Sequence, residues 1–104
     1  MGKKFLTFSY DDGTVYDRRL VELLNKYGLK CTFNLNSGLF GQSHILSWDN
    51  YSVEHTKIQA EEVKDLYKGH EVAAHSVTHP RLSDLDEAGV IHEVEDDRKD
   101  LSQL

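Results

Sequence analysis

The chain has 104 residues, a formal net charge of −6 and a hydrophobic fraction of 38%, which suits one small globular domain. The acidic excess argues against nucleic acid as a partner, because phosphate binding needs a basic surface. A single cysteine excludes an internal disulfide, and no apolar run approaches the roughly 20 residues that cross a bilayer. Since no signal-peptide pattern is seen either, we expect no membrane partner and, by default, a cytoplasmic location.

The first half of the chain predicts a strand, a helix and a second strand. Residues 4–10 alternate their side chains and are rich in aromatics, which favours a strand. Residues 14–27 place apolar side chains at helical spacing. Residues 30–35 form the second expected strand, with Cys31 on its core side. Residues 36–55 are rich in Gly, Ser and Asn and are predicted to form a long loop.

The second half continues the alternation. A capping-box pattern at residues 56–59 predicts a helix over 56–68, and residues 71–74 form a short third strand. A last helix is expected from Ser83 towards the end, with Val90, Ile91, Val94 and Leu101 as its apolar side. Alternating strands and helices predict an α/β fold with a parallel sheet and right-handed crossovers.

Two polar clusters follow two of these strands. Asp11, Asp12 and Gly13 follow the first strand, and His75 and His79 follow the third. In parallel folds, functional sites collect beyond the carboxyl ends of the strands. Adjacent parallel strands would bring both clusters to the same edge of one sheet.

Two imidazoles and one carboxylate make a metal site with open positions. Side chains alternate along a strand, so one aspartate can bind the metal while its neighbour stands off as a base. Each motif has an ordinary explanation when taken alone. An Asp-Asp-Gly triplet is a common turn former, and a close histidine pair is unsurprising among six histidines. Their shared position at strand ends favours a metal site.

These residues resemble the polysaccharide deacetylases, the carbohydrate esterases that share the NodB homology domain. Residues 8–13 (Phe-Ser-Tyr-Asp-Asp-Gly) resemble the first motif of that family, and residues 75–80 (His-Ser-Val-Thr-His-Pro) resemble the second. The resemblance implies a partial (β/α) barrel, in which residues 1–104 are the N-terminal portion, about half, of a longer domain. The mild departures are Tyr10 for Phe and Ser9 for Thr.

The resemblance also implies roles for four residues. Asp11 would be the general base, while Asp12, His75 and His79 would hold a divalent metal ion. Zinc is the first expectation, and cobalt, manganese, nickel and iron(II) are the others. The reaction would be hydrolysis of an N- or O-linked acetyl group on a polysaccharide or oligosaccharide. Such a metal lowers the pKa of a bound water and polarises the acetyl carbonyl.

The later motifs of the family have no counterpart in this sequence. They supply an arginine that orients the base and a histidine that acts as general acid, and His92 matches neither. We therefore interpret the chain as an N-terminal portion of the enzyme. Three strands of a barrel leave an open sheet edge, which would favour self-association.

Two other functions stay open at this point. One is a degenerate, non-catalytic glycan-binding domain; the other is an iron oxygenase with two histidines and one carboxylate, against which the alternating elements argue. The remaining histidines, His44, His55 and His70, are expected at the surface or in packing. Three aromatic side chains would either line a sugar site or pin the long loop to the core: Phe40, Trp48 and Tyr51.

Overall fold

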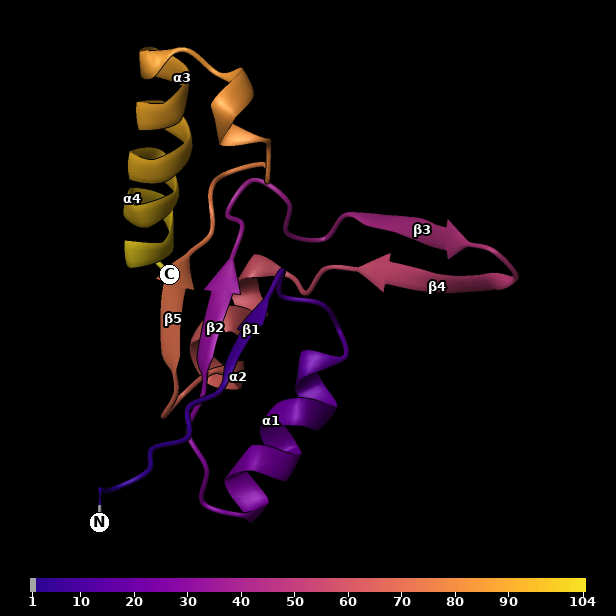
Figure 1. Cartoon of the computed structure of the whole chain (residues 1–104), viewed down its shortest axis with the longest axis vertical. Coiled ribbons are helices and arrows are strands. Elements are labelled where there is room, and N and C mark those ends of the chain that lie inside the picture. Colours follow the sequence, from indigo (N-terminus) through magenta and orange to yellow (C-terminus); the bar gives the residue numbers. More distant parts are fainter. Residues whose placement is uncertain (1) are drawn as a thin grey trace.

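The computed structural model describes residues 2–104 as a parallel sheet flanked by helices, with a hairpin that projects from it (Figure 1). The three-stranded sheet has the order β1 (Ser9–Asp11), β2 (Thr32–Leu35) and β5 (Glu71–Ala74). Both pairings are parallel. The predicted α/β class with parallel strands is thus confirmed, and β5 has the bounds expected from the sequence.

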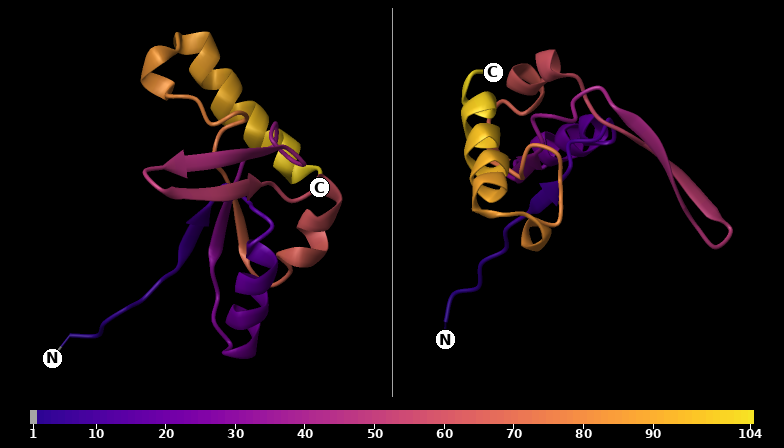
Figure 2. Two further views of the ribbon diagram at one scale, coloured as in Figure 1. Left: turned by 90° about the vertical axis from the view of Figure 1, so that its right-hand side faces the viewer. Right: turned by 90° about the horizontal axis from the view of Figure 1, so that it is seen from above.

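The helices occupy two places around this sheet (Figure 2). The helix α1 (Asp17–Lys26) and the short helix α2 (Val63–Leu66) share one core with β2. The second group lies beside β5 and runs from α3 (Glu87–Ile91) through a π-helical turn (His92–Asp96) into α4 (Asp97–Ser102). Within residues 2–104, no helix has both the length and the apolar character to cross a membrane.

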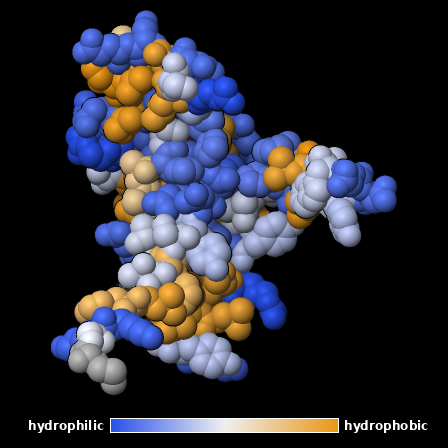
Figure 3. All heavy atoms as spheres, viewed as in Figure 1, coloured by the Kyte–Doolittle hydropathy of each residue, from blue (hydrophilic) through white to orange (hydrophobic). Residues whose placement is uncertain are grey.

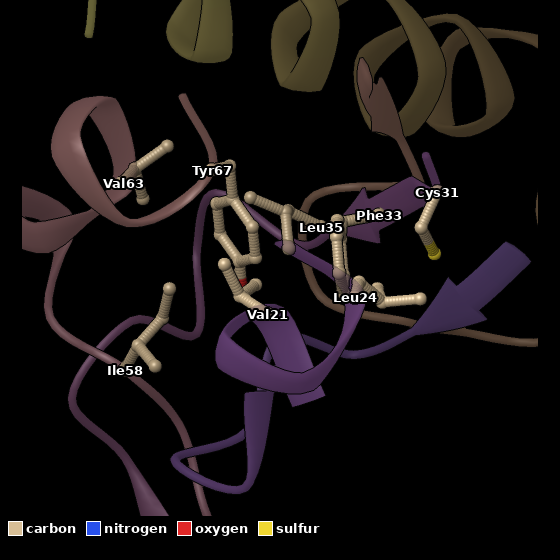
Figure 4. Packing of buried hydrophobic residues seen from close by; sticks show 8 residues of the cluster. All are labelled: Val21, Leu24, Cys31, Phe33, Leu35, Ile58, Val63 and Tyr67. Atoms are coloured by element: carbon tan, nitrogen blue, oxygen red, sulfur yellow. The ribbon is translucent and has the colours of Figure 1, made fainter. Parts of the chain in front are cut away.

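The core is a single cluster between α1, α2 and the sheet (Figure 4). Phe33 and Leu35 of β2 have no exposed surface, and their rings and methyl groups face Val21 and Leu24 of α1. Cys31 lies in this cluster, as the alternation of its strand predicted. Phe40 packs against the same cluster, which answers the open question for that side chain.

The first strand is shorter than predicted. We expected residues 4–10, but only Ser9–Asp11 pair with β2. Phe5 and Leu6 are 88% and 79% exposed, because no segment lies opposite them. The aromatic pattern favours an extended chain, and only a partner strand turns that chain into a sheet.

The predicted loop over residues 36–55 is wrong, because most of it forms an antiparallel hairpin. Its strands are β3 (Ser43–Trp48) and β4 (Tyr51–Thr56), joined at Asp49 and Asn50. Asp49 has a positive φ of 49°, a conformation that aspartate tolerates in tight turns. Both faces of the hairpin are largely exposed, and the Gly, Ser and Asn content of residues 36–55 favoured a loop although Tyr51–Thr56 alternates apolar and polar side chains.

The helix predicted over residues 56–68 is also shorter than expected. Thr56 ends β4, and Lys57 forms a β-bridge with Thr14. A 3-10 turn (Ala60–Glu62) then leads into α2, and Gln59 precedes it without a side-chain cap. The first two residues of the capping-box pattern, Thr56 and Lys57, therefore pair with other segments, because tertiary pairing overrides the local preference for a helix start.

The last helix begins later than predicted, and only part of its expected apolar side is covered: Leu101 packs against the core and Val90 is half-buried. A 3-10 turn (Leu82–Asp84) precedes it, and Asp86 caps α3 by accepting a hydrogen bond from the backbone of Gly89 at 2.8 Å. Its most buried side chains are the acidic Asp97, with no exposed surface, and Glu93, 7% exposed. Ile91 and Val94, which we expected to be covered, are 54% and 44% exposed, and apolar side chains are visible over this end of the molecule (Figure 3).

Candidate metal centre

The two polar clusters meet at the carboxyl edge of the parallel sheet, as predicted. Asp11 ends β1, Asp12 follows it, and His75 follows β5 directly. The strands are not adjacent, however, because β2 lies between them and pairs with both. The parallel register aligns Asp11 with Asn34 and Leu35 with Ala74, so all three strands end at the same level. Side chains can therefore converge across β2.

Asp12, His75 and His79 form the centre of this site. Asp12 Oδ1 lies 3.5 Å from His75 Nε2 and 3.5 Å from His79 Nε2. The three candidate ligand atoms all lie within 4.8 Å of one another. The two imidazole rings are 4.9 Å apart and inclined by 65°, so each points one nitrogen towards the carboxylate. This arrangement leaves a space that one small cation would fill.

Unpaired polar atoms at this point fit a cation. Asp12 Oδ1 and His75 Nε2 are buried and have no hydrogen-bond partner among residues 2–104. Buried polar atoms in folded proteins are nearly always paired, so two facing atoms without partners need an explanation. A carboxylate oxygen and neutral imidazole nitrogens are the donors that zinc and related divalent metals prefer. The residues present therefore fit the metal that the family resemblance implies.

Asp11 lies beside this cluster and outside it. Its side chain is 58% exposed, and its Oδ2 lies 3.9 Å from His75 Nε2. The other oxygen, Oδ1, accepts a hydrogen bond from Asn34 Nδ2 at 2.9 Å. The two aspartate side chains thus diverge where β1 ends, because Asp12 lies beyond the strand with a φ of 81°. One carboxylate faces the histidines, while the other is held next to them and faces solvent.

The backbone at this site adopts unusual conformations. Asp12, Ser76 and His79 have φ values of 81°, 72° and 58°. Apart from Asp49 at the tip of the hairpin, these are the positive-φ residues other than glycine in residues 2–104. Such conformations cost of order 1–3 kcal/mol each and cluster at functional sites. Gly13 follows with φ 61°, and a Cβ there would lie only 2.8 Å from Leu35 Cδ2, so the turn also requires a glycine.

Main-chain hydrogen bonds fix the position of Asp12. Its N–H donates to the carbonyl of Asn34 at 2.9 Å. Its carbonyl accepts from Lys57 Nζ at 2.7 Å, and Lys57 is only 6% exposed. Burial lowers the pKa of the Lys57 ammonium, against the nearby charges of Asp12 and Asp17. The base of the hairpin therefore holds the backbone of the candidate ligand.

Two buried carboxylates from the last helix hold the loop that carries the histidines. Asp97 has no exposed surface, and it accepts from the N–H of His75 at 2.8 Å and from the N–H of Ser37 at 2.6 Å. Glu93 accepts from the N–H and hydroxyl of Thr78, at 2.9 and 2.6 Å. These contacts explain why two acids of the helix are buried.

The π-helical turn that contains Glu93 also contacts the histidine loop through its backbone. It spans His92–Asp96 and leaves the carbonyl of Glu93 accepting from the N–H of Val77 at 3.1 Å. Burial raises the pKa of Glu93, but the hydrogen bonds from Thr78 and Val77 outweigh it and hold that pKa below its ordinary value. Glu93 therefore binds the loop as a carboxylate. Sequence reasoning missed both acids, since charged helix positions are usually solvated.

His55 is a further member of the site that the sequence did not predict. Its Nε2 lies 4.0 Å from Asp12 Oδ2, and its side chain is 17% exposed. Burial and the nearby Lys57 ammonium lower its pKa. We expected a surface or packing role, and only the unpredicted hairpin brings this residue to the candidate metal centre. His70 does have a packing role, because its Nδ1 accepts from the N–H of Cys31 at 3.1 Å.

The fold and this site define an α/β protein whose sheet edge gathers two histidines and two aspartates. The sequence model of the polysaccharide deacetylase family matches residues 1–104. A chitin deacetylase from Pestalotiopsis sp. is 32% identical over 83 residues, which are 79% of this chain and 24% of that protein. No solved structure matches the chain. The chain therefore belongs to the polysaccharide deacetylase family, and it spans about a quarter of the length of this relative.

Proposed function

We propose that this chain contributes the metal centre and the general base of a metal-dependent carbohydrate deacetylase. The observation that supports this most is the pair of buried, unpartnered atoms Asp12 Oδ1 and His75 Nε2, which face each other at 3.5 Å. Membership of the polysaccharide deacetylase family makes an acetylated glycan the substrate class. The name of the similar chitin deacetylase makes an N-acetylated polymer the first substrate to test.

In this proposal Asp12, His75 and His79 hold one divalent cation. Zinc fits the donor set best, and cobalt, manganese, nickel and iron(II) accept the same donors. When bound, the metal supplies Lewis acidity, which lowers the pKa of a water and polarises the acetyl carbonyl. The buried bonds to Asp97 and Glu93 keep the histidine loop in place for this task.

Asp11 is the proposed general base. Asn34 orients one of its oxygens by a 2.9 Å hydrogen bond, and the other lies 3.9 Å from His75 Nε2. That free oxygen is at the mouth of the site and can take the proton of the attacking water. A base must lie near the metal without binding it, and the divergence of the two aspartates provides this position.

We further propose that the sheet is the start of a (β/α) barrel. The strands β1, β2 and β5 are parallel and follow the chain order once the hairpin is set aside. Residues 1–104 would then be the N-terminal portion of the domain, and the acid that protonates the leaving group would come from a later segment. The parallel sheet argues against an iron oxygenase, because those enzymes that share this ligand set have all-β folds.

Paired variants of the two aspartates test this function. Asp12→Asn should lower zinc affinity by more than about 100-fold, since it removes a ligand and not only an outer partner. Asp11→Asn should keep that affinity and abolish release of acetate from an N-acetylated oligosaccharide by the complete protein. Titration calorimetry measures the first and an acetate assay the second. Unchanged zinc affinity in Asp12→Asn, or unchanged turnover in Asp11→Asn, would refute the respective role.

A further inference from the structure

One face of the β3–β4 hairpin combines side chains that the proposed chemistry leaves without a role. The antiparallel register places His44 opposite His55, and Trp48 opposite Tyr51. Opposed residues share a face, and successive residues alternate between faces. This face, which we call the aromatic face, consists of His44, Leu46, Trp48, Tyr51, Val53 and His55. The opposite face carries Ser43, Ile45, Ser47, Ser52, Glu54 and Thr56.

The aromatic face begins at the metal centre. His55 Nε2 lies 4.0 Å from Asp12 Oδ2, at the base of the hairpin. This base is fixed to the sheet edge, because the N–H of Val15 donates to the carbonyl of Thr56 at 2.9 Å. Tyr16 also donates its hydroxyl to the carbonyl of Glu54 at 3.0 Å. The direction in which the hairpin leaves the body is therefore set by residues next to the site.

The far end of the aromatic face is an exposed pair of rings. Trp48 and Tyr51 stack with their centroids 6.3 Å apart and their planes inclined by 29°. They are 54% and 69% exposed, and they do not belong to the core cluster. The question left open by the sequence is thus answered for them: they do not pin the segment to the core. Figures 1 and 2 show the hairpin standing away from the rest of the molecule.

The composition of this face indicates what binds it. None of its members is an acid, a lysine or an arginine. A polyanion would therefore find no counter-charge, and the net charge of −6 would repel it. Flat aromatic rings beside aliphatic side chains suit a neutral ligand with apolar faces and hydroxyl groups at its rim, such as a sugar ring.

We propose that the aromatic face binds the chain of a neutral, N-acetylated glycan whose reacting acetyl group lies at the metal centre. This proposal rests on the proposed deacetylase function and specifies its substrate as an oligomer or polymer. Tyr51 and His55 are four positions apart along β4, a span of about 14 Å at roughly 3.4 Å per residue. A single sugar at the metal centre does not reach the ring pair, whereas a chain of several sugars does.

The chain offers its own probe for this surface, because Trp48 is its sole tryptophan. We expect the N-acetylglucosamine hexamer to change the fluorescence of Trp48, and N-acetylglucosamine itself to leave it unchanged at the same sugar concentration. Tyr51→Ala should weaken hexamer binding by about tenfold, which corresponds to the upper range for one aromatic stacking contact. Ile45→Ala is the matched control: it is 63% exposed on the opposite face and should bind normally.

The outcomes separate this proposal from the function on which it rests. Normal acetate release from the hexamer by the complete protein, with no response of Trp48, would overturn the glycan surface and leave the deacetylase intact. A Trp48 response without acetate release would support the surface and count against the enzyme. Equal losses in Tyr51→Ala and Ile45→Ala would overturn the assignment of the face. Sedimentation that shows a dimer disrupted by Tyr51→Ala would assign the face to a second copy instead.

Discussion

The loop from His75 to His79 and the β3–β4 hairpin both reach Asp12, but they are held in opposite ways. The loop is fixed from within, because the buried carboxylates of Glu93 and Asp97 accept hydrogen bonds from its backbone. The hairpin is fixed only at its base, and residues 43–54 are all exposed. The difference indicates that the candidate ligands need a set position, whereas the outer hairpin needs an open surface.

The largest effect is expected at Asp97. Asp97→Ala removes the buried acceptor of the Ser37 N–H and one of two acceptors of the His75 N–H, which keeps the carbonyl of Leu35 at 2.9 Å. Bonds to charged groups contribute about 1.5–3 kcal/mol each, so we expect a loss of about 3 kcal/mol in the free energy of unfolding. Zinc affinity should fall as well, because the backbone of a candidate ligand is released. Urea denaturation and titration calorimetry measure the two effects.

Asp100 provides the matched control for this substitution. It lies three residues further along α4, is exposed, and its carboxylate accepts a hydrogen bond from the hydroxyl of Ser37 at 3.2 Å. Asp100→Ala should change stability by less than about 0.5 kcal/mol. Equal effects of the two substitutions would mean that acidity of the helix, and not the buried contact, stabilises the loop.

The next effect is expected at Glu93 and depends on pH. Its pKa is lowered in the fold, so the stability it contributes is present above its ordinary pKa of 4.5 and is lost as pH falls through the lowered value. Glu93→Gln should cost about 1–2 kcal/mol at pH 7 and flatten the loss of stability below pH 4.5. Urea unfolding of both proteins, measured between pH 3 and 7 in steps of roughly one pH unit, gives the free energy of unfolding at each pH.

Glu95 serves as the control, since it is exposed and pairs only with Arg98 at 3.1 Å. Glu95→Gln should change the free energy of unfolding at pH 7 by less than about 0.5 kcal/mol. Parallel pH curves for the parent protein and Glu93→Gln would show that Glu93 does not hold the loop as a carboxylate.

The sequence predicted the parallel sheet and the convergence of both motifs, for a physical reason. Local patterns identify the strands, as the alternation around Phe33 does, and show that Asp11 and His75 lie at strand ends. Parallel topology then places these strand ends at one edge of the sheet. The hairpin escaped prediction because the Gly, Ser and Asn residues around it favoured a loop, although Tyr51–Thr56 alternates apolar and polar side chains.

The supporting residues of the site escaped prediction for a different reason. Glu93 and Asp97 look like ordinary charged positions of an amphipathic helix, and only tertiary contacts with Thr78 and His75 give them a role. His55 lies 43 residues from Asp12 in the sequence, and the hairpin that joins them was not expected. Candidate ligands follow from motifs, whereas their supporting contacts follow from the fold.

A smaller effect, confined to the metal, is expected at His55. His55→Ala should lower zinc affinity by about tenfold, the lower end for outer partners of a ligand, because the 4.0 Å contact with Asp12 is longer than a hydrogen bond. Stability should hardly change. Competition with a chelator measures the affinity, and His44→Ala is the control, since His44 contacts the ring of His55 and is exposed. An equal loss in His44→Ala would show that the hairpin, and not His55, supports the carboxylate.

The smallest effect is expected in the outer hairpin. Val53→Ala truncates a side chain that is 37% exposed, so the free energy of unfolding should change by no more than about 0.5 kcal/mol. A two-stranded hairpin is marginally stable without further packing, so its amides should exchange by local opening. Hydrogen exchange at Leu46 and Val53 should therefore be faster than at Phe33, which is fully buried in β2. Equal protection of the hairpin and β2 would mean that both open only with the whole fold, and the contrast between a fixed loop and an independently opening hairpin would be lost.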